Sequence, residues 1–168
     1  MVKLLFYITE AILIGFLIPI SVIDIRKFRI GNKWLLAMLP FAVLRAVFAG
    51  ILSVHNGTIW WKAVLSHFAG GSVMFLLFLL LAICRGGIGG GDIKLAGILG
   101  LSLGFSGVFL GFSVGMVFAC IYGLVLKAIS RVKNPCIQLA PFLSLGAAAG
   151  MVLTSLLPIE QLPELFIL

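Results

Sequence analysis

Residues 93–126 read IKLAGILGLSLGFSGVFLGFSVGMVFACIYGLVL, a run of 34 residues in which Lys94 is the only charge. A helix needs roughly 20 apolar residues to cross the hydrocarbon core of a bilayer. The run is too long for one ordinary span and too short for two full ones, and its best turn signal is the GFSG sequence at 104–107. The sequence therefore predicts two shortened or tilted helices, joined by a turn at 104–107.

Apolar stretches of span length lie on both sides of this run, at residues 4–23, 34–54, 63–83 and 137–157. Hydrophobic residues make up 62% of the 168 residues and charged residues 10%, which is outside the range of soluble globular proteins. We expect an all-α, polytopic membrane bundle of about six transmembrane helices, folded as one domain over residues 1–168. The first stretch is expected to be a retained span, because Glu10 interrupts it and it lacks the A-x-A cleavage signal of a signal peptide.

The basic residues indicate how the bundle is oriented. A net charge of +7 would suggest a nucleic-acid partner in a soluble protein, but here the basic residues lie mostly in short loops between apolar runs, so we expect no such partner. Positive loops stay on the cytoplasmic side of a membrane. Six spans place nine of the twelve basic residues on that side, with both termini outside, whereas five spans place six there. The nine are Arg26, Lys27, Arg29, Lys33, Arg85, Lys94, Lys127, Arg131 and Lys133. The sequence thus predicts a multi-pass protein of the cytoplasmic (inner) membrane.

Asp24 and Asp92 are two of only five acidic residues, and both are predicted at the cytoplasmic ends of spans. A carboxylate costs about 2.5–3.5 kcal/mol at the centre of a span, so each acid near lipid needs a reason. The six-span topology brings the two to one membrane depth. Two carboxyl groups a few ångströms apart share a proton, so one can act as base while the other acts as acid. This pair predicts an aspartic peptidase that uses no metal and no cofactor.

Each aspartate also has an interpretation without catalysis. Asp24 could pair with Arg26 or Lys27 in a solvated loop, and Asp92 could cap the helix that follows it. The glycines between 86 and 91 could form a flexible turn, or could adopt positive φ angles and let another chain approach closely. The alternative function is a non-enzymatic small transporter, or an assembly subunit of a pilus or secretion system, in which the aspartates bind a cation or fix topology.

Three segments, in order along the chain, match a known pattern. Residues 24–26 read DIR and are followed by IGN at 30–32, residues 89–95 read GGGDIKL, and residues 139–146 read LAPFLSLG. They resemble the D-x-R-x3-I-P-N motif, the GxGD-x-K-L motif and the Pro-Phe-containing sixth span of the type IV prepilin peptidase family of membrane aspartic peptidases. The resemblance is to the short, peptidase-only members, because the chain has no CxxC pairs of the kind found in the insert of the methylating members.

The resemblance implies a membrane aspartic endopeptidase that removes the basic leader peptide from prepilin-like or preflagellin-like proteins at the cytoplasmic membrane face. It implies that Asp24 and Asp92 are the catalytic pair. Residues expected to bind substrate or to shape the loop are Gly89, Gly90, Gly91, Asn32 and Lys94. Gly31 stands where the family usually has proline, which makes the first loop less rigid.

Structural roles are expected for Arg26, Pro141, Glu10 and Arg45. Glu10 and Arg45 fall at comparable depth in the first two spans, so they predict an intramembrane ion pair; alternatively Arg45 snorkels and Glu10 is protonated or near the outer surface. The glycines at 70–71 and at 107, 111 and 115 have the small-residue spacing of helix contacts. We expect these contacts within the chain in preference to dimerisation, and the sequence leaves the oligomeric state open.

Overall fold

The computed structural model describes residues 1–55, 57, 59–85, 88–130 and 138–156. Within them the chain forms helices and no strand, which confirms the predicted all-α class. The helices are α1 (Val2–Lys27), α2 (Asn32–His55), α3 (Trp60–Arg85), α4 (Gly90–Ser130) and α5 (Ala140–Leu156). Most extend a few residues beyond the predicted apolar cores, because the helical backbone continues into the polar flanks.

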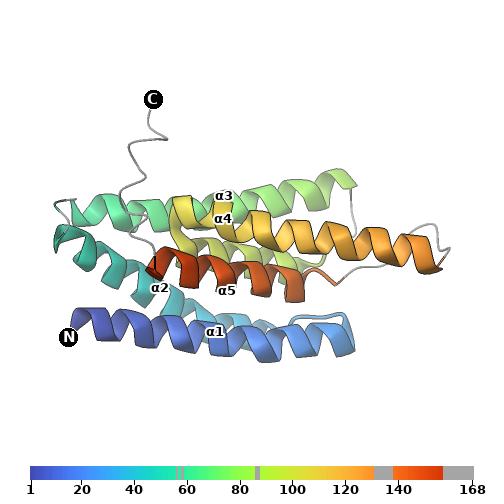
Figure 1. Cartoon of the computed structure of the whole chain (residues 1–168), viewed down its shortest axis with the longest axis horizontal. Coiled ribbons are helices and arrows are strands. Elements are labelled where there is room, and N and C mark those ends of the chain that lie inside the picture. The colour runs from blue at the N-terminus through green and yellow to red at the C-terminus, as the bar shows by residue number, and fades with distance from the viewer. Residues whose placement is uncertain (56, 58, 86–87, 131–137, 157–168) are drawn as a thin grey trace.

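α4 is broken at Gly104, where φ is 74° and ψ is 170°. Glycine reaches this backbone region because it has no Cβ. Leu103 and Gly111 would be about 12 Å apart along a straight helix, yet a Cβ on Gly111 would lie 3.2 Å from Leu103 Cδ1. The chain therefore reverses, and segments 90–104 and 105–130 of α4 run back along each other (Figure 1). The turn predicted at 104–107 is confirmed, and the helix breaks at Gly104, the first of these residues.

The surface of the bundle fits a lipid environment. α1, α2, α3 and α4 are long and apolar enough to cross a membrane, and α5 is a shorter apolar helix. Large apolar side chains project outward, with Leu36 72% exposed and Ile83 74% exposed. Soluble proteins rarely expose so much apolar surface to water, whereas in a membrane lipid chains cover it. The chain is a polytopic helical membrane protein, and the count of six spans with both termini outside stays a prediction.

Glycines set the spacing between the helices. A Cβ on Gly70 of α3 would lie 2.8 Å from the carbonyl oxygen of Gly100, and one on Gly115 would lie 2.6 Å from that of Phe142 in α5. Contacts this short leave no room for a side chain. The glycines at 70–71, 111 and 115 thus let α3, α4 and α5 pack backbone to backbone, as predicted for contacts within the chain.

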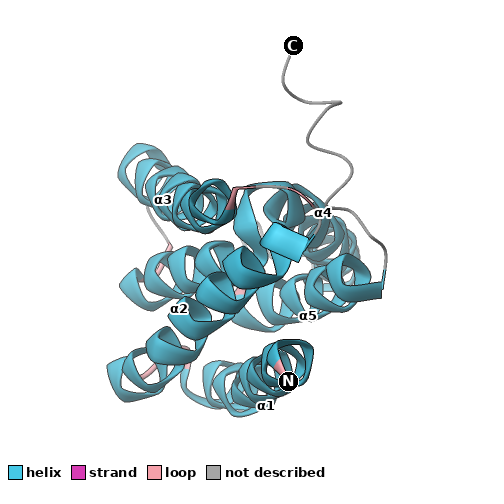
Figure 2. Ribbon diagram, turned by 90° about the vertical axis from the view of Figure 1, so that its left-hand side faces the viewer, coloured by secondary structure: helices cyan, strands magenta, loops and turns pink. Residues whose placement is uncertain are grey.

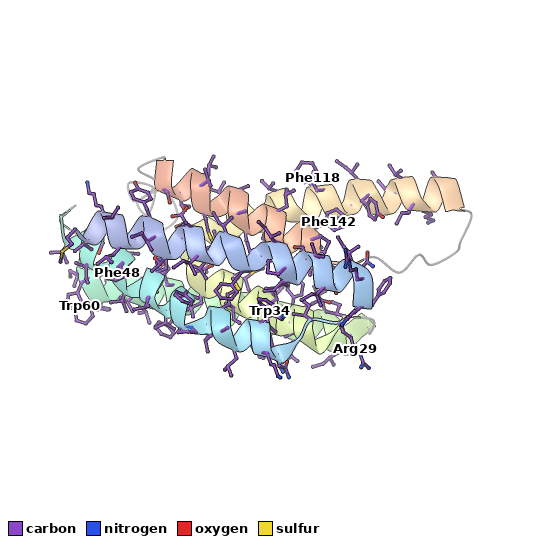
Figure 3. The ribbon with its side chains drawn as sticks, turned by 90° about the horizontal axis from the view of Figure 1, so that it is seen from below. Arg29, Trp34, Phe48, Trp60, Phe118 and Phe142 are labelled. Atoms are coloured by element: carbon purple, nitrogen blue, oxygen red, sulfur yellow. The ribbon has the colours of Figure 1, made fainter. Side chains whose placement is uncertain are left out.

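Arg26, Lys27, Lys33 and Lys94 belong to helix ends that meet at one end of the bundle, whereas Lys3 and Lys62 lie near the starts of α1 and α3 at the other. The first of these ends is where the C-terminal end of α1 and the N-terminal ends of α2, α4 and α5 meet (Figure 1). Arg29 lies at this end and Trp60 at the opposite one (Figure 3). Viewed along the bundle, α1 lies beside α2 and α5 and away from α3 (Figure 2). We call the end that carries Arg29 the basic end.

Candidate active site

Asp24 lies inside α1, just after the predicted apolar span 4–23, and not in the solvated loop of the alternative interpretation. The helix continues to Lys27 and ends where Phe28 takes a left-handed conformation, with φ 50°, and its N–H donates to the Asp24 carbonyl oxygen at 2.8 Å. Asp24 is only 5% exposed. The helix thus carries this carboxyl group into the packed end of the bundle.

The surroundings of Asp24 differ from those of a solvated ion pair. Arg26 and Lys27 are exposed, and among the described residues no ion pair joins either to Asp24. The backbone N–H of Ala140, the first residue of α5, donates instead to the Asp24 carboxylate. The first amides of a helix have no partner within the helix, so they are available to bind a carboxylate. The interpretation of Asp24 as half of a surface ion pair is not supported.

Asp92 is the third residue of α4, and its carboxylate accepts a hydrogen bond from the backbone N–H of Gly89. The N–H of Asp92 in turn donates to the Gly89 carbonyl oxygen at 3.0 Å. This arrangement resembles a capping box, in which an acid in the first turn binds the amide just before the helix. The predicted capping role of Asp92 is therefore present, and it occupies one side of the carboxylate only.

The two carboxyl groups come together from segments 68 positions apart in the sequence. They lie close enough for the charge of Asp24 to act on Asp92. One oxygen of each, Asp24 Oδ2 and Asp92 Oδ1, is buried and has no hydrogen-bond partner among the described residues. Buried polar atoms are nearly always hydrogen-bonded, so unpartnered oxygens on two neighbouring acids make this place the candidate site.

Glycine lets the loop between α1 and α2 approach the start of α4. A Cβ on Gly91 would lie 2.9 Å from the Cβ of Ile30, so a larger residue would push the two segments apart. A Cβ on Gly89 would lie 3.2 Å from Asp92 Oδ2, and one on Gly90 would meet nothing within 4 Å. Gly91 thus allows a close approach within the chain, and the approach of another chain to these glycines stays a prediction.

The positive φ angles expected for these glycines are not observed. The glycines with positive φ in the described chain are Gly57 and Gly104, whereas Gly90 and Gly91 already belong to α4 and are helical. The glycines at 86 and 87 lie outside the described residues. The role of the triplet 89–91 is to remove side chains from the first turn of the helix.

A second polar contact joins the two motif segments. Lys94 Nζ donates to Asn32 Oδ1 at 3.2 Å, across the outer side of α2 and α4. Both side chains are exposed. Arg26, for which a structural role was predicted, lies in the last turn of α1, and its side chain forms no hydrogen bond or ion pair with another described residue. The motif positions therefore divide into a carboxyl pair, with Asp24 buried and Asp92 half-buried, and an exposed Asn32–Lys94 pair.

α5 supplies parts of the site that sequence reasoning missed. Gln138 Nε2 donates to the carbonyl oxygen of Ile25 at 3.2 Å, next to the Ala140 amide that binds Asp24. Pro141 occupies the second position of α5, where its missing N–H breaks no helical hydrogen bond. The LAPF sequence marked this region without showing which atoms face Asp24. The available signal was that the free amides at the start of a helix bind carboxylates, which could have predicted a contact between the start of α5 and Asp24.

Glu10 and Arg45 form the predicted ion pair, with Arg45 Nη2 3.6 Å from Glu10 Oε2. Arg45 Nη1 also donates to the carbonyl oxygen of Ser102, and Ser155 Oγ donates to Glu10 Oε2 at 2.5 Å. Ser102 lies just before the break at Gly104, where helical carbonyl groups lose their usual partners. Because lipid offers no hydrogen bonds, the arginine satisfies a backbone group that the break leaves free.

Comparison with known proteins identifies a family for the chain. The sequence model of the type IV leader peptidase family matches residues 11–124, which include both aspartates. A prepilin leader peptidase/N-methyltransferase of Bacillus subtilis (strain 168) is 29% identical over 137 residues. The match covers 81% of this chain and 52% of that protein, so the chain spans about half the length of the relative. No solved structure matches the chain.

Proposed function

Because the chain belongs to the type IV leader peptidase family, as its motifs predicted, we propose that it is an aspartic endopeptidase with Asp24 and Asp92 as its catalytic pair. Its substrates are prepilin-like or preflagellin-like proteins, from which it removes the basic leader peptide. The observation that carries the proposal is the pairing of buried Asp24 with half-buried Asp92, each with one buried oxygen that no described residue binds.

The reaction needs one proton shared between the two carboxyl groups. The ionised aspartate takes a proton from a water molecule, which attacks the carbonyl carbon of the scissile peptide bond. The protonated aspartate donates a hydrogen bond to the oxygen that becomes negative. The roles then reverse, the C–N bond breaks, and the amine leaves with the proton. The amides of Gly89 and Ala140 hold the outer sides of the carboxyl groups, which leaves Asp92 Oδ1 and Asp24 Oδ2 for water and substrate.

The basic end of the bundle is the proposed cytoplasmic face. The side chains of Arg26, Lys27 and Arg29 are exposed there, around the loop next to Asp24. Positive residues are retained in the cytoplasm during insertion, so the carboxyl pair would face the cytoplasm at the inner surface of the cell membrane. We restrict the proposed activity to hydrolysis, since the CxxC pairs that accompany methyl transfer are not in this sequence.

The direct test is the conversion of each acid to its amide, Asp24→Asn and Asp92→Asn, in the membrane-inserted protein. Cleavage of a prepilin-like substrate should fall by about 10²–10⁴-fold, the usual contribution of a general acid or base. Normal insertion and an unchanged melting temperature would show that the variants are folded. Parent-level cleavage by either variant would disprove the proposal, and aspartate-dependent ion flux in liposomes without cleavage would favour a transporter.

A further inference from the structure

An apolar groove of about 400 Å³ runs between α2, α3 and the first segment of α4. Its floor consists of buried side chains, Leu35 from α2 with Ile98 and Leu101 from α4. Its walls are Leu36 and Leu39 of α2 and Phe75 of α3, each between 39% and 72% exposed. The groove therefore opens on the outside of the bundle, where lipid would lie.

The polar end of the groove is formed by the two motif segments. Asn32 and Lys94 both line it, and their exposed hydrogen bond joins α2 and α4 at this end. Lys94 is two residues after Asp92 on the same helix. The first turn of α4 therefore lies between the groove and the carboxyl pair. Gly89 and Gly90 are exposed there and carry no side chain, and a Cβ on Gly90 would touch nothing. An extended chain could thus pass from the groove over this turn to the carboxyl pair.

The dimensions of the groove define what fits it. The lining positions run from 32 to 39 on α2 and from 94 to 101 on α4, about 10 Å or two helical turns in each case. A polypeptide at this depth in lipid must be helical to satisfy its own backbone. The volume is too small for a whole helix but accepts the apolar side chains along one face of it, as in other helix-in-groove complexes.

We propose that this groove is the docking surface for a membrane-spanning helix of the substrate, with the scissile bond in the chain that leads from that helix over Gly89 and Gly90. The inference rests on the proposed peptidase function. Its own support is that the apolar groove leads to its polar end at Asn32 and Lys94, and that this end adjoins the glycine turn before Asp92.

The test compares two substrates that share one cleavage site, one with its apolar helix and one truncated to a soluble peptide. Replacing a groove wall by a larger side chain, in Leu39→Trp or Leu36→Trp, should reduce the preference for the helix-bearing substrate by about tenfold, the effect of losing roughly 1.4 kcal/mol of binding. Leu80→Trp is the matched control, because Leu80 is 60% exposed on α3 outside the groove. It should leave the preference unchanged.

A photo-reactive residue at position 39 gives a second measurement that does not depend on catalysis. In an Asp92→Asn background it should capture the helix-bearing substrate, and the same residue at position 80 should not. Adducts with lipid alone, or with a second copy of the chain, would overturn the proposal. An unchanged preference in both tryptophan variants would overturn docking alone, whereas a parent enzyme that cleaves neither substrate would refute the peptidase function and docking with it.

Discussion

Glu10 and Asp92 are both acidic side chains packed inside this bundle, yet their surroundings differ. Glu10 accepts a hydrogen bond from Ser155 at 2.5 Å and lies 3.6 Å from Arg45, which itself binds the Ser102 carbonyl oxygen. Asp92 is bound by one backbone amide and keeps an unpartnered oxygen beside Asp24. The intramembrane cluster of Glu10, Arg45, Ser102 and Ser155 therefore balances its charge, and the carboxyl pair does not.

This difference supports a structural role for the intramembrane cluster and the proposed catalytic role for the carboxyl pair. A buried charge with its counterion holds helices in place, and the intramembrane cluster joins α1, α2, α4 and α5. A pair of like charges with free oxygens does not stabilise a fold, so its presence calls for a ligand or a reaction. Arg45 Nε also has no partner among the described residues, but it belongs to a cation whose charge is already matched.

The largest effect expected on the structural side is the loss of Arg45. Arg45→Met keeps the apolar stem but leaves Glu10 without its counterion and the Ser102 carbonyl group without its donor. The free energy of unfolding should fall by about 3–5 kcal/mol, as for other buried ion pairs that lose one member. Thermal unfolding in detergent micelles measures the change.

The matching control removes both charges at once. Arg45→Met combined with Glu10→Leu leaves no unpaired charge and should recover much of the lost stability. Cleavage per folded molecule should stay near the parent value in the double variant. If Arg45→Met alone is as stable as the parent, the assignment of this cluster as structural is wrong.

A smaller effect is expected within the glycine triplet. In Gly91→Ala the new Cβ would collide with Ile30 and displace the loop that follows Asp24. Small misplacements of catalytic groups are costly, so kcat should fall by roughly 10- to 100-fold. Gly15→Ala in α1 is the control, since its Cβ would enter open space, about 13 Å along the helix from Asp24, and the change should alter kcat little. Equal effects of the two substitutions would contradict the proposed close approach.

The smallest effect concerns α5. Gln138→Ala removes the hydrogen bond to the Ile25 carbonyl oxygen and loosens the α5 terminus that holds Asp24. A single hydrogen bond contributes about 0.5–1.5 kcal/mol, so kcat should decrease by about 2- to 10-fold while KM changes little. Ser113→Ala, which removes an exposed side-chain hydrogen bond to the Phe109 carbonyl oxygen within α4, serves as control. An effect on KM alone would assign Gln138 to substrate binding.

Much of this arrangement could be predicted from the sequence, because it depends on strong local signals. The length of the 93–126 run required a break, and glycine at 104 supplied the residue able to make it. The scarcity of acids directed attention to Asp24, Asp92 and Glu10. Because successive spans run in opposite directions, the sequence then predicted that both aspartates lie at one end of the bundle and that Glu10 lies beside Arg45.

The rest depended on how the helices are rotated against each other. Ser102 and Ser155 lie 57 and 145 positions from the side chains that they bind, and Gln138 lies 113 positions from Ile25. Hydrophobic periodicity is weak in helices that are apolar on all sides, so it does not tell which face meets which neighbour. The ends of helices were also misplaced, since polar residues such as Arg26 continue α1.

The central claim is that Asp24 and Asp92 act as one unit on one substrate. Its most direct test is the cleavage rate of the double variant Asp24→Asn with Asp92→Asn, compared with each single variant. Groups that act together are strongly non-additive, so the double variant should be no slower than the slower single one. Losses that multiply in the double variant would show two independent contributions and contradict the shared site.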